Sequence, residues 1–424
     1  MRIERALAVP GSGGYFNEDL EAIRAGAPKD GFFYVGSPLS EGFTRIKEPS
    51  EAISIVLLLE NGQAVVGDCL SVEFAAAGGR QGRFRAEEQL PWLEMLCGRL
   101  EGRLVSSFLE MSDKLEQELP PGAHRAAAMY GASQALLQAV AAKQQTTAAE
   151  ALAAEFGVGV ADAPIPIYVQ TGEDRHTNVD KAILKEADVF PHGLINDIEL
   201  TFGRDGARFS EYVAWVADRI RRFGRNGFCA ELHFDVYGLP GQVFNNDIER
   251  IADYLANLER LASPYPVCVE MPLEMDSRDA QIEAFARLRE ALVRRESGIK
   301  VIVDEWANDL DDIKAFVEAD ASDMINVKSP DLGSIANAAR AILACWQGGV
   351  RPILGGSCTD TDQSARVMAH VALACRPAWV LARPGMGVDE GLQIVRNEML
   401  RTLAIISAQR RRKPDEALTD RASW

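Results

Sequence analysis

Short apolar runs recur at regular intervals through the second half of the chain, and most are separated by helical patterns. One such pattern places Ile251, Leu255 and Leu258 on a single helix face. Alternating strands and helices predict parallel pairing, and eight strands are the number that a closed (β/α)8 barrel requires. A doubly wound open sheet is the alternative, since it differs only in strand order. The eight predicted strands are 165–170, 187–191, 231–235, 267–270, 300–304, 323–328, 352–355 and 378–382.

The first part of the chain shows a different pattern, in which strands come first and helices follow. An apolar run at 52–60, the turn dipeptide Asn61-Gly62 and a second run at 63–69 predict a β-hairpin. Helical spacing at 93–100 and an alanine-rich stretch at 125–142 predict two helices. We therefore predict a small sheet followed by a helical bundle.

The change of pattern near residue 160 predicts an α/β protein of two domains. An N-terminal α+β capping domain would cover residues 1–160, and the barrel would cover residues 161–408. Glycine-rich stretches at 10–14 and 78–80 punctuate the segments around the hairpin. The final segment, 409–424, runs basic and then polar, and we expect it to be a flexible tail.

Composition and charge narrow the class of partner. The chain has 424 residues and a formal net charge of −17, which disfavours a nucleic acid or an acidic membrane as partner. Attraction of an anionic substrate would therefore have to be local. Seven cysteines without a Cys-x-x-Cys pair, and no signal-like N-terminus, suggest a reduced cytoplasmic protein. No apolar run approaches the roughly 20 residues of a membrane span.

Three acidic residues follow consecutive predicted strands and suggest a metal site. Asp235, Glu270 and Asp304 are separated by 35 and 34 residues, about one strand-helix-strand repeat. Each alone is better explained as a helix cap or a solvated turn residue. Together at one barrel mouth, three carboxylates would repel one another without a cation. Oxygen ligands without thiolate or imidazole favour Mg²⁺ or Mn²⁺ over zinc.

Basic and polar side chains at other strand ends complete the candidate site. Lys328 ends the sixth strand, where a metal and partial burial would lower its pKa and make it a candidate base. His192 ends the second strand, across the barrel, and is either structural or a second acid or base. Gln170 ends the first strand and suits orientation of a polar group, whereas we expect His233 to be structural.

Other chemistries fit some of these residues. A lysine at the end of a sixth barrel strand is compatible with a Schiff-base aldolase, although the surplus of carboxylates argues against it. A non-catalytic binding protein would keep the scaffold without needing the full set of acids and bases. A phosphate-loop interpretation of residues 11–14 fails, because no Walker lysine follows and no Rossmann spacing is present.

The same residues carry a resemblance to a known family. Asp235, Glu270, Asp304 and Lys328, with the two-domain layout, resemble the enolase superfamily, in which lysine or histidine bases work beside Mg²⁺. The closer resemblance is to the methylaspartate ammonia-lyases, and it extends from about residue 8 to about residue 408. The matching stretches are DGFFYVGSPLSEGFT, NVDKAILKEADVFPHGLIN, HFDVYG, VDEW, KSPDLG, GGSCTDT and RPGMGVDEG.

The resemblance implies an activity and a set of roles. It implies elimination of ammonia from (2S,3S)-3-methylaspartate to give mesaconate, through C3 proton abstraction and a metal-stabilised enediolate. Lys328 would remove the C3 proton, His192 would serve the opposite C3 configuration, and the three carboxylates would bind Mg²⁺. It also implies a cytoplasmic homodimer, an amino dicarboxylate substrate and a possible monovalent cation. The implied substrate-binding residues are Gln170, Asn326, Ser357, Cys358, Glu73 and Leu381.

The chain departs from the expected family pattern at five positions. Glu73 and Asn326 stand where glutamine is expected, Ile353 replaces an aromatic residue, Ser357 a threonine and Tyr168 a phenylalanine. These changes leave the preferred substrate open, so a different substituted aspartate is an alternative. Another superfamily reaction on a carboxylate substrate, such as dehydration or racemisation, is a second alternative.

Overall fold

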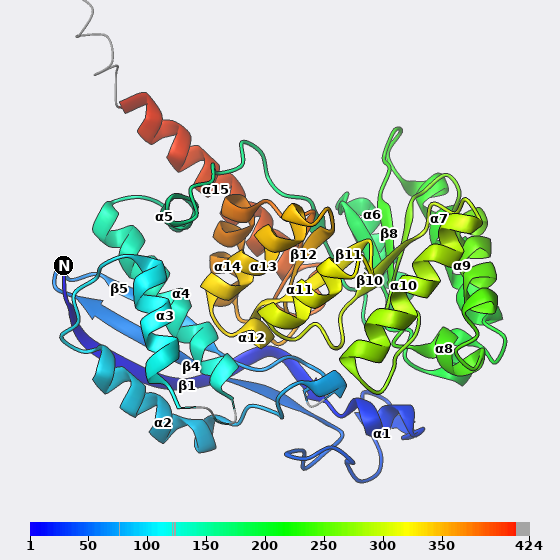
Figure 1. The fold of residues 1–424 in the computed structure, drawn as a ribbon, viewed down its shortest axis with the longest axis horizontal. Coiled ribbons are helices and arrows are strands. Elements are labelled where there is room, and N and C mark those ends of the chain that lie inside the picture. Colours follow the sequence, from blue (N-terminus) through cyan, green and yellow to red (C-terminus); the bar gives the residue numbers. More distant parts are fainter. Residues whose placement is uncertain (76, 121, 123, 413–424) are drawn as a thin grey trace, which may run out of the picture.

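The computed structural model describes residues 1–75, 77–120, 122 and 124–412. Figure 1 shows a long N-terminal sheet along one side of the molecule, helices packed beside it, and a barrel of strands and helices next to them. The first region contains β1 (Ile3–Glu18), α1 (Leu20–Arg24), β2 (Lys29–Asp30), β3 (Phe33–Tyr34), β4 (Lys47–Leu59), β5 (Ala64–Cys69), a 3-10 turn (Ala77–Gly79), α2 (Ala86–Leu100), α3 (Phe108–Glu118), α4 (Arg125–Gln144) and α5 (Ala148–Glu155).

The predicted hairpin is confirmed and forms part of a three-stranded antiparallel sheet. β4 pairs with β5 on one side and with β1 on the other. Alternate residues of β4, including Ile53, Ile55 and Leu57, are fully buried, as period-2 alternation requires of a sheet with one covered face. The helices predicted at 93–100 and 125–142 are confirmed as parts of α2 and α4.

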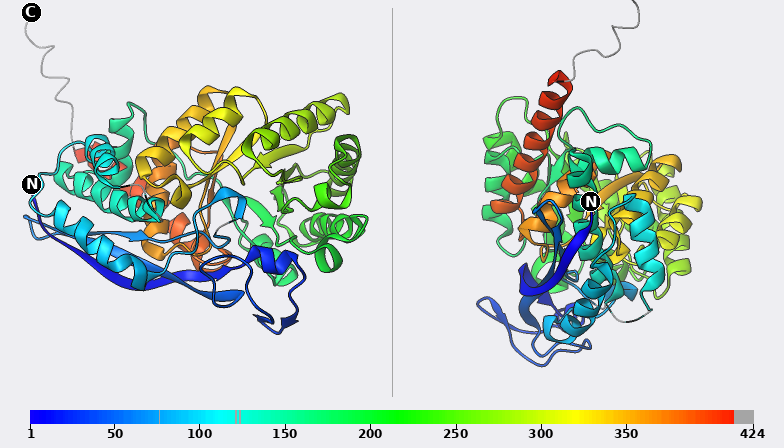
Figure 2. Two further views of the ribbon diagram at one scale, coloured as in Figure 1. Left: turned by 60° about the horizontal axis from the view of Figure 1, so that its bottom comes forward. Right: turned by 90° about the vertical axis from the view of Figure 1, so that its left-hand side faces the viewer.

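The glycine-rich stretch at 10–14 is not a break between elements, because it lies inside β1. The pairing register of β1 shifts between Ser12 and Phe16, so the strand bends there. A Cβ atom on Gly14 would lie 2.3 Å from the carbonyl oxygen of Asp360, and the Gly14 N–H donates to the carbonyl oxygen of Thr359. Glycine therefore lets β1 cross close to the barrel, which brings the end of β1 to the barrel mouth. Figure 2 shows this long strand running beneath the molecule.

The second region is a closed barrel of eight parallel strands, as predicted. The strand order is β10-β11-β12-β13-β6-β7-β8-β9, which excludes the open sheet. The strands are β6 (Ile167–Tyr168), β7 (Val189–His192), β8 (Glu231–Asp235), β9 (Val267–Glu270), β10 (Lys300–Val303), β11 (Met324–Lys328), β12 (Arg351–Gly355) and β13 (Trp379–Leu381). The continuous apolar runs match strands buried on both faces.

Helices connect and surround the strands (Figure 1). Their starts follow local sequence: Asp247 accepts from two backbone N–H groups at the start of α9, and Thr361 forms a capping box with Ser364 at the start of α14. The helices are α6 (Arg175–Leu184), a π-helical turn (Ile198–Phe202), α7 (Ala207–Phe223), α8 (Leu239–Val243), α9 (Ile248–Ala262), α10 (Arg278–Arg294), α11 (Leu310–Glu318), α12 (Ser329–Leu332), α13 (Ile335–Gln347), α14 (Asp362–Cys375) and α15 (Glu390–Arg412).

The C-terminal boundary differs from the prediction. Helix α15 continues through Arg412, so residues 409–412 are helical and do not belong to a flexible tail. The rest of the predicted tail, residues 413–424, lies outside the described residues. Across the described part of the chain, none of the helices has both the length and the apolar character needed to cross a bilayer.

Candidate active site

Three buried carboxylates meet at the C-terminal ends of neighbouring barrel strands. Asp235 and Glu270 end β8 and β9 and face each other in the parallel register, and Asp304 directly follows β10. Their exposed fractions are 4%, 0% and 2%. The structure thus places the three carboxylates at neighbouring strand ends on one edge of the barrel, whereas the ligand-type atoms found within 4.8 Å of one another in the described residues are those of His192, His233 and Glu270. The role of the three carboxylates as metal ligands stays a prediction.

The cluster carries uncompensated negative charge on one side and cations on the other. Burial, followed by the charge of Glu270, holds the pKa of Asp235 well above its usual value. Asp304 instead contacts Lys328 Nζ at 2.6 Å and Arg80 Nη2 at 2.7 Å. Burial raises the pKa of Asp304 while both cations lower it; with two cations this close, we take Asp304 as ionised.

Lys328 ends β11 and points into the carboxylate cluster. The neighbouring carboxylates hold the pKa of Lys328 above its usual value, opposite in direction to the lowering expected from a bound dication. Burial and Arg80 lower the pKa of Lys328, and the charges of Asp304, Glu305 and Glu270 outweigh them. The carboxylates raise the pKa of the Lys328 ammonium group. A cation bound to those carboxylates would lower it.

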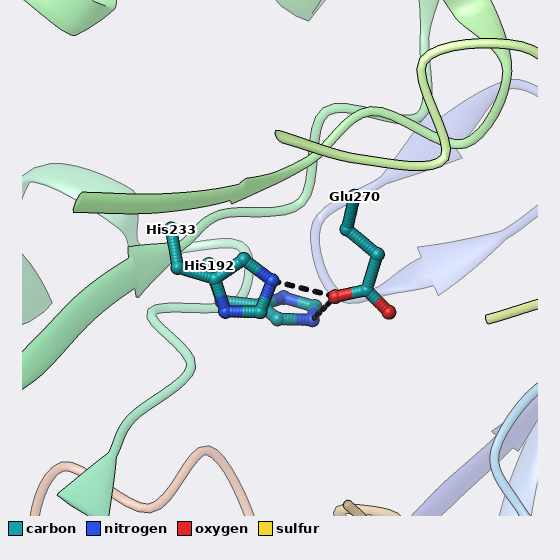
Figure 3. Close-up of side chains that lie close together, drawn as sticks. All are labelled: His192, His233 and Glu270. Atoms are coloured by element: carbon teal, nitrogen blue, oxygen red, sulfur yellow. Dashed lines mark hydrogen bonds and ion pairs between the residues drawn. The ribbon is translucent and has the colours of Figure 1, made fainter. Parts of the chain in front are cut away.

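Two histidines, His192 on β7 and His233 on β8, approach the same carboxylate of Glu270 on β9 (Figure 3). His233 Nε2 lies 2.6 Å from Glu270 Oε2, and His192 Nε2 lies 3.8 Å from the same oxygen and 3.6 Å from Asp235 Oδ2. Burial, followed by the charge of His233, lowers the pKa of His192 to about 3, so its imidazole is neutral. The structural role expected for His233 stays a prediction; its contact places it where it would orient a candidate metal ligand.

Glu270 is the most constrained of the three carboxylates. Asn326 Nδ2 donates to its Oε1 at 2.9 Å, while His233 contacts Oε2. Burial alone would raise the pKa of Glu270. The His233 contact and the neighbouring histidine and lysine charges lower it by a larger amount, so the net shift is downward. Glu270 is therefore held as an oriented carboxylate.

A second set of possible metal ligands overlaps the first. His192, His233 and Glu270 offer ligand atoms that all lie within 4.8 Å of one another. Imidazole ligands suit zinc and later transition metals, whereas carboxylates suit magnesium. We favour the carboxylate set, because the His233–Glu270 contact already has hydrogen-bond length and orients the carboxylate.

A small pocket lies directly above these groups. It is lined by Lys328, His192 and Asp235 together with most of the predicted substrate-binding residues, which are Gln170, Asn326, Ser357, Cys358 and Glu73. We call it the reaction pocket. Leu381 is different: it lies inside the barrel, packed with Tyr168 and Ile353, and it is not among the residues that line the pocket. Its predicted contact with substrate is therefore not seen directly.

Glu73 reaches into the reaction pocket from the N-terminal region. The Cys358 thiol donates to Glu73 Oε2 at 2.9 Å, and the Glu73 N–H donates to Ser357 Oγ at 2.8 Å. Burial, followed by the charge of Glu18, raises the pKa of Glu73 to about 8. Burial also raises the pKa of Cys358, so the thiol stays protonated and serves as a hydrogen-bond donor.

Glu73 makes the folded state sensitive to pH. Its pKa rises from 4.5 to about 8 on folding, so the folded chain must bind a proton between these values. The contribution of Glu73 to the free energy of unfolding has its full value below pH 4.5. It is lost as the pH rises through 8. We expect Glu73→Gln to be more stable than the wild type at pH 8, with a difference that shrinks toward pH 5, measured by urea unfolding. Glu199→Gln, at an exposed glutamate, should show no such trend.

Arg80 links the two regions and was not found by sequence reasoning. Its guanidinium is 1% exposed and contacts Asp304, Glu305 and Asp331, at 2.7, 2.9 and 2.9 Å. Gly78 precedes it with φ 55°, and a Cβ there would lie 2.5 Å from Glu305 Cγ. The glycine pair before Arg80 was the only local signal, since it permits this close approach.

Several strand ends at the barrel mouth adopt left-handed backbone conformations. His192, Tyr237, Met271 and Trp306 have φ values of 56°, 47°, 49° and 68°. Each follows or ends a strand that carries a candidate site residue. Such conformations cost about 1–3 kcal/mol for a non-glycine residue and collect at functional sites. The strain therefore coincides with the proposed site.

Comparison with known proteins gives a consistent result over the whole chain. Family models described as methylaspartate ammonia-lyase N-terminus and C-terminus match residues 1–157 and 159–408. Methylaspartate ammonia-lyase 1 from Carboxydothermus hydrogenoformans is 44% identical, over 96% of this chain and 97% of its own.

Two solved structures are similar as well. The Mg-complex of β-methylaspartase from Clostridium tetanomorphum is 40% identical, with a TM-score of 0.90 over 96% of this chain and all of that chain. Citrobacter amalonaticus methylaspartate ammonia lyase containing (2S,3S)-3-methylaspartic acid is also 40% identical, with a TM-score of 0.93 over the same shares.

Proposed function

The chain belongs to the methylaspartate ammonia-lyase family, and we propose that it eliminates ammonia from (2S,3S)-3-methylaspartate to give mesaconate, with Lys328 as the base. One observation carries the assignment of the base: Lys328 and His192 end strands on opposite sides of the barrel, with the carboxylate cluster between them. Two groups able to exchange protons thus face a single pocket from opposite sides.

The residues present fit a divalent metal. Three buried carboxylates supply hard oxygen ligands, and His233 and Asn326 orient one of them. The raised pKa of Asp235 indicates charge that a cation would stabilise. Bound Mg²⁺ would act as a Lewis acid that stabilises negative charge on the substrate carboxylate next to C3 and lowers the pKa of Lys328. The solved Mg-complex of a 40% identical relative supports this choice of ion.

The positions of the side chains suggest how the proton is transferred and how ammonia is lost. We propose that Lys328 Nζ accepts the proton from C3, on one face of the substrate. The electron pair left at C3 then forms the double bond to C2 as the C2–N bond breaks and ammonia leaves. His192, neutral and on the other face, is placed to take the proton of the opposite C3 configuration.

The pocket walls offer groups that suit the remaining parts of the substrate. The side-chain oxygen of Gln170 is buried without a hydrogen-bond partner among the described residues, so it is an acceptor available to the substrate ammonium group. Ser357 and Cys358 follow Gly356; the Ser357 N–H donates to Asp360 Oδ2 at 2.9 Å, so a substrate carboxylate could accept from the Cys358 N–H and the Ser357 hydroxyl. Because the pKa of Glu73 is raised to about 8, only its ionised form would favour an ammonium group and disfavour a carboxylate beside it.

Replacing His192 tests the two-sided arrangement. We expect His192→Asn to lower kcat toward (2S,3R)-3-methylaspartate by about 100-fold or more, because the proton acceptor on that face is removed. Activity toward the (2S,3S) substrate should fall far less, because Lys328 is retained. Mesaconate absorbance measures both rates. Equal losses with the two diastereomers would show that His192 has no face-specific role.

A different reaction on the same scaffold is distinguished by its products. A hydroxy acid turned over without release of ammonia would indicate dehydration or racemisation. A Schiff-base aldolase would be trapped on Lys328 by borohydride and would keep its activity in EDTA. The surplus of carboxylates around Lys328 favours a metal site over a Schiff base, and the EDTA and borohydride tests separate the two.

A further inference from the structure

A second cavity, of about 360 Å³, lies beside the reaction pocket and is not used by the proposed reaction. Leu194, in the loop after β7, lines this cavity and also a small space whose other walls include Gln170 and His192 of the reaction pocket. The other walls of the second cavity come from the start of α6, the same loop, and the β2–β3 hairpin, through Arg175, Asn196, Lys29 and Tyr34. We call this second cavity the vestibule cavity. Its volume is large enough for a small dicarboxylate.

Arg175 is a cation at this cavity without a matching anion. Within the described part of the chain its guanidinium donates no hydrogen bond and has no carboxylate oxygen within 4.0 Å, and its Nη1 is buried. It stacks on the Tyr212 ring at 5.0 Å, which fixes its position without neutralising its charge. Arginine in such a place is suited to a bidentate carboxylate.

Asn196 adds a second donor without an acceptor. The residue is 6% exposed, and its side-chain nitrogen has no hydrogen-bond partner among the described residues. Buried donors are normally paired, so an unpaired amide and an unpaired guanidinium that line the same cavity indicate a missing acceptor. One carboxylate, with two oxygens and several lone pairs, matches both donors.

The acidic groups at the cavity are already engaged. Glu173 is held by Lys47 at 2.9 Å and Lys29 at 3.1 Å, and Asp197 accepts from the Leu200 N–H at 2.7 Å. Arg175 is therefore the cation left free to meet an incoming anion. The chain carries a net charge of −17, so a dianionic ligand needs such a local positive group near the pocket.

We propose that Arg175 and Asn196 form a carboxylate-binding site in the vestibule cavity, where a dicarboxylate of the substrate or product class docks beside the reaction pocket. The choice of a dicarboxylate as ligand rests on the proposed function. The two unpaired donors and the cavity are observed independently of that function. The Arg175 fork takes one carboxylate in two parallel hydrogen bonds, and the Asn196 amide donates to the same group.

The test is a calorimetric titration of the full-length protein with succinate, in EDTA. We expect saturable binding that Arg175→Gln weakens by about tenfold or more, the value for losing a charged hydrogen bond. Arg175→Lys should weaken it less, because the charge stays. Asn196→Asp, which keeps the side-chain shape, should also weaken binding by repulsion. Arg204→Gln, at an exposed arginine paired with Glu199, is the matched control and should bind like the wild type.

Four outcomes would overturn the proposal. They are no saturable binding of succinate, equal affinities for the Arg175→Gln and Arg204→Gln variants, equal binding of inorganic phosphate, and loss of binding in Lys328→Ala but not in Arg175→Gln. The last would place succinate in the reaction pocket. Because the titration needs no turnover, a failure of 3-methylaspartate to react would leave this result intact.

Discussion

Replacing Lys328 by alanine is expected to lower kcat for (2S,3S)-3-methylaspartate by about three orders of magnitude, within the range that a positioned general base contributes. The reason is geometric, because Lys328 Nζ is held at 2.6 Å from Asp304 and lines the reaction pocket. No other lysine lines that pocket in the described part of the chain. Mesaconate formation, followed by absorbance with saturating substrate and Mg²⁺, measures the effect.

Lys328→Arg is the matched variant for charge. It keeps the cation beside Asp304, but a guanidinium does not give up its proton at neutral pH and so cannot act as a base. We expect it to be as inactive as Lys328→Ala. Both variants should still bind Mn²⁺, followed by electron paramagnetic resonance, since the three carboxylates remain. Substantial activity in either variant would show that Lys328 is not the base.

Replacing Arg80 by methionine should destabilise the fold by about 3–5 kcal/mol, the cost of breaking a buried ion pair by removing one partner. Methionine fills much of the same volume, so the loss is mainly that of charge. Arg80 is 1% exposed and is the cation shared by Asp304, Glu305 and Asp331. Its removal leaves Glu305 and Asp331 without this partner, while Asp304 keeps Lys328. Urea unfolding at pH 7, with the midpoint and slope compared, measures the change.

Arg222→Met, at an exposed arginine on α7 that pairs only with Asp218, is the control and should unfold like the wild type. Raising the Mg²⁺ concentration should recover part of the stability of Arg80→Met, because a cation at the neighbouring carboxylates opposes the same repulsion. An unfolding midpoint for Arg80→Met equal to that of Arg222→Met would show that the Arg80 ion pairs contribute nothing net.

The barrel could be predicted because its strands are fully buried. Continuous apolar runs gave β8 and β9 their observed limits, Glu231–Asp235 and Val267–Glu270, and each run ends on a carboxylate. Strand ends of a parallel barrel share one edge, so the spacing of the carboxylates also predicted their convergence. Burial and periodicity are local signals, and these parts of the site depend only on them.

The parts that were missed depend on contacts between distant segments. β1 was not recognised because its glycines look like a loop, although they serve the close crossing at Asp360. Arg80 and Asp304 are 224 residues apart, and no local pattern connects them. The raised pKa of Lys328 likewise reflects three carboxylates acting together, one at the end of β9 and two directly after β10. Such effects arise only when the chain is folded.

His233 shows a different limit. His233 lies two residues before Asp235, and side chains alternate along a strand. The sequence therefore predicts that both side chains lie on the same side of β8. What the sequence could not show was the partner, because Glu270 lies on the next strand and its Oε2 is 2.6 Å from His233 Nε2. The role of a histidine as ligand, base or orienting group depends on that partner.

The most direct test of the account is a single assay of the purified full-length protein with 3-methylaspartate and Mg²⁺. Absorbance of the unsaturated diacid and released ammonia are followed together. We expect the two products in equal amounts, loss of both on addition of EDTA, and recovery on addition of excess Mg²⁺. Folded protein that gives no turnover above background, or that keeps its full activity in EDTA, would contradict a metal-dependent ammonia-lyase built on these three carboxylates.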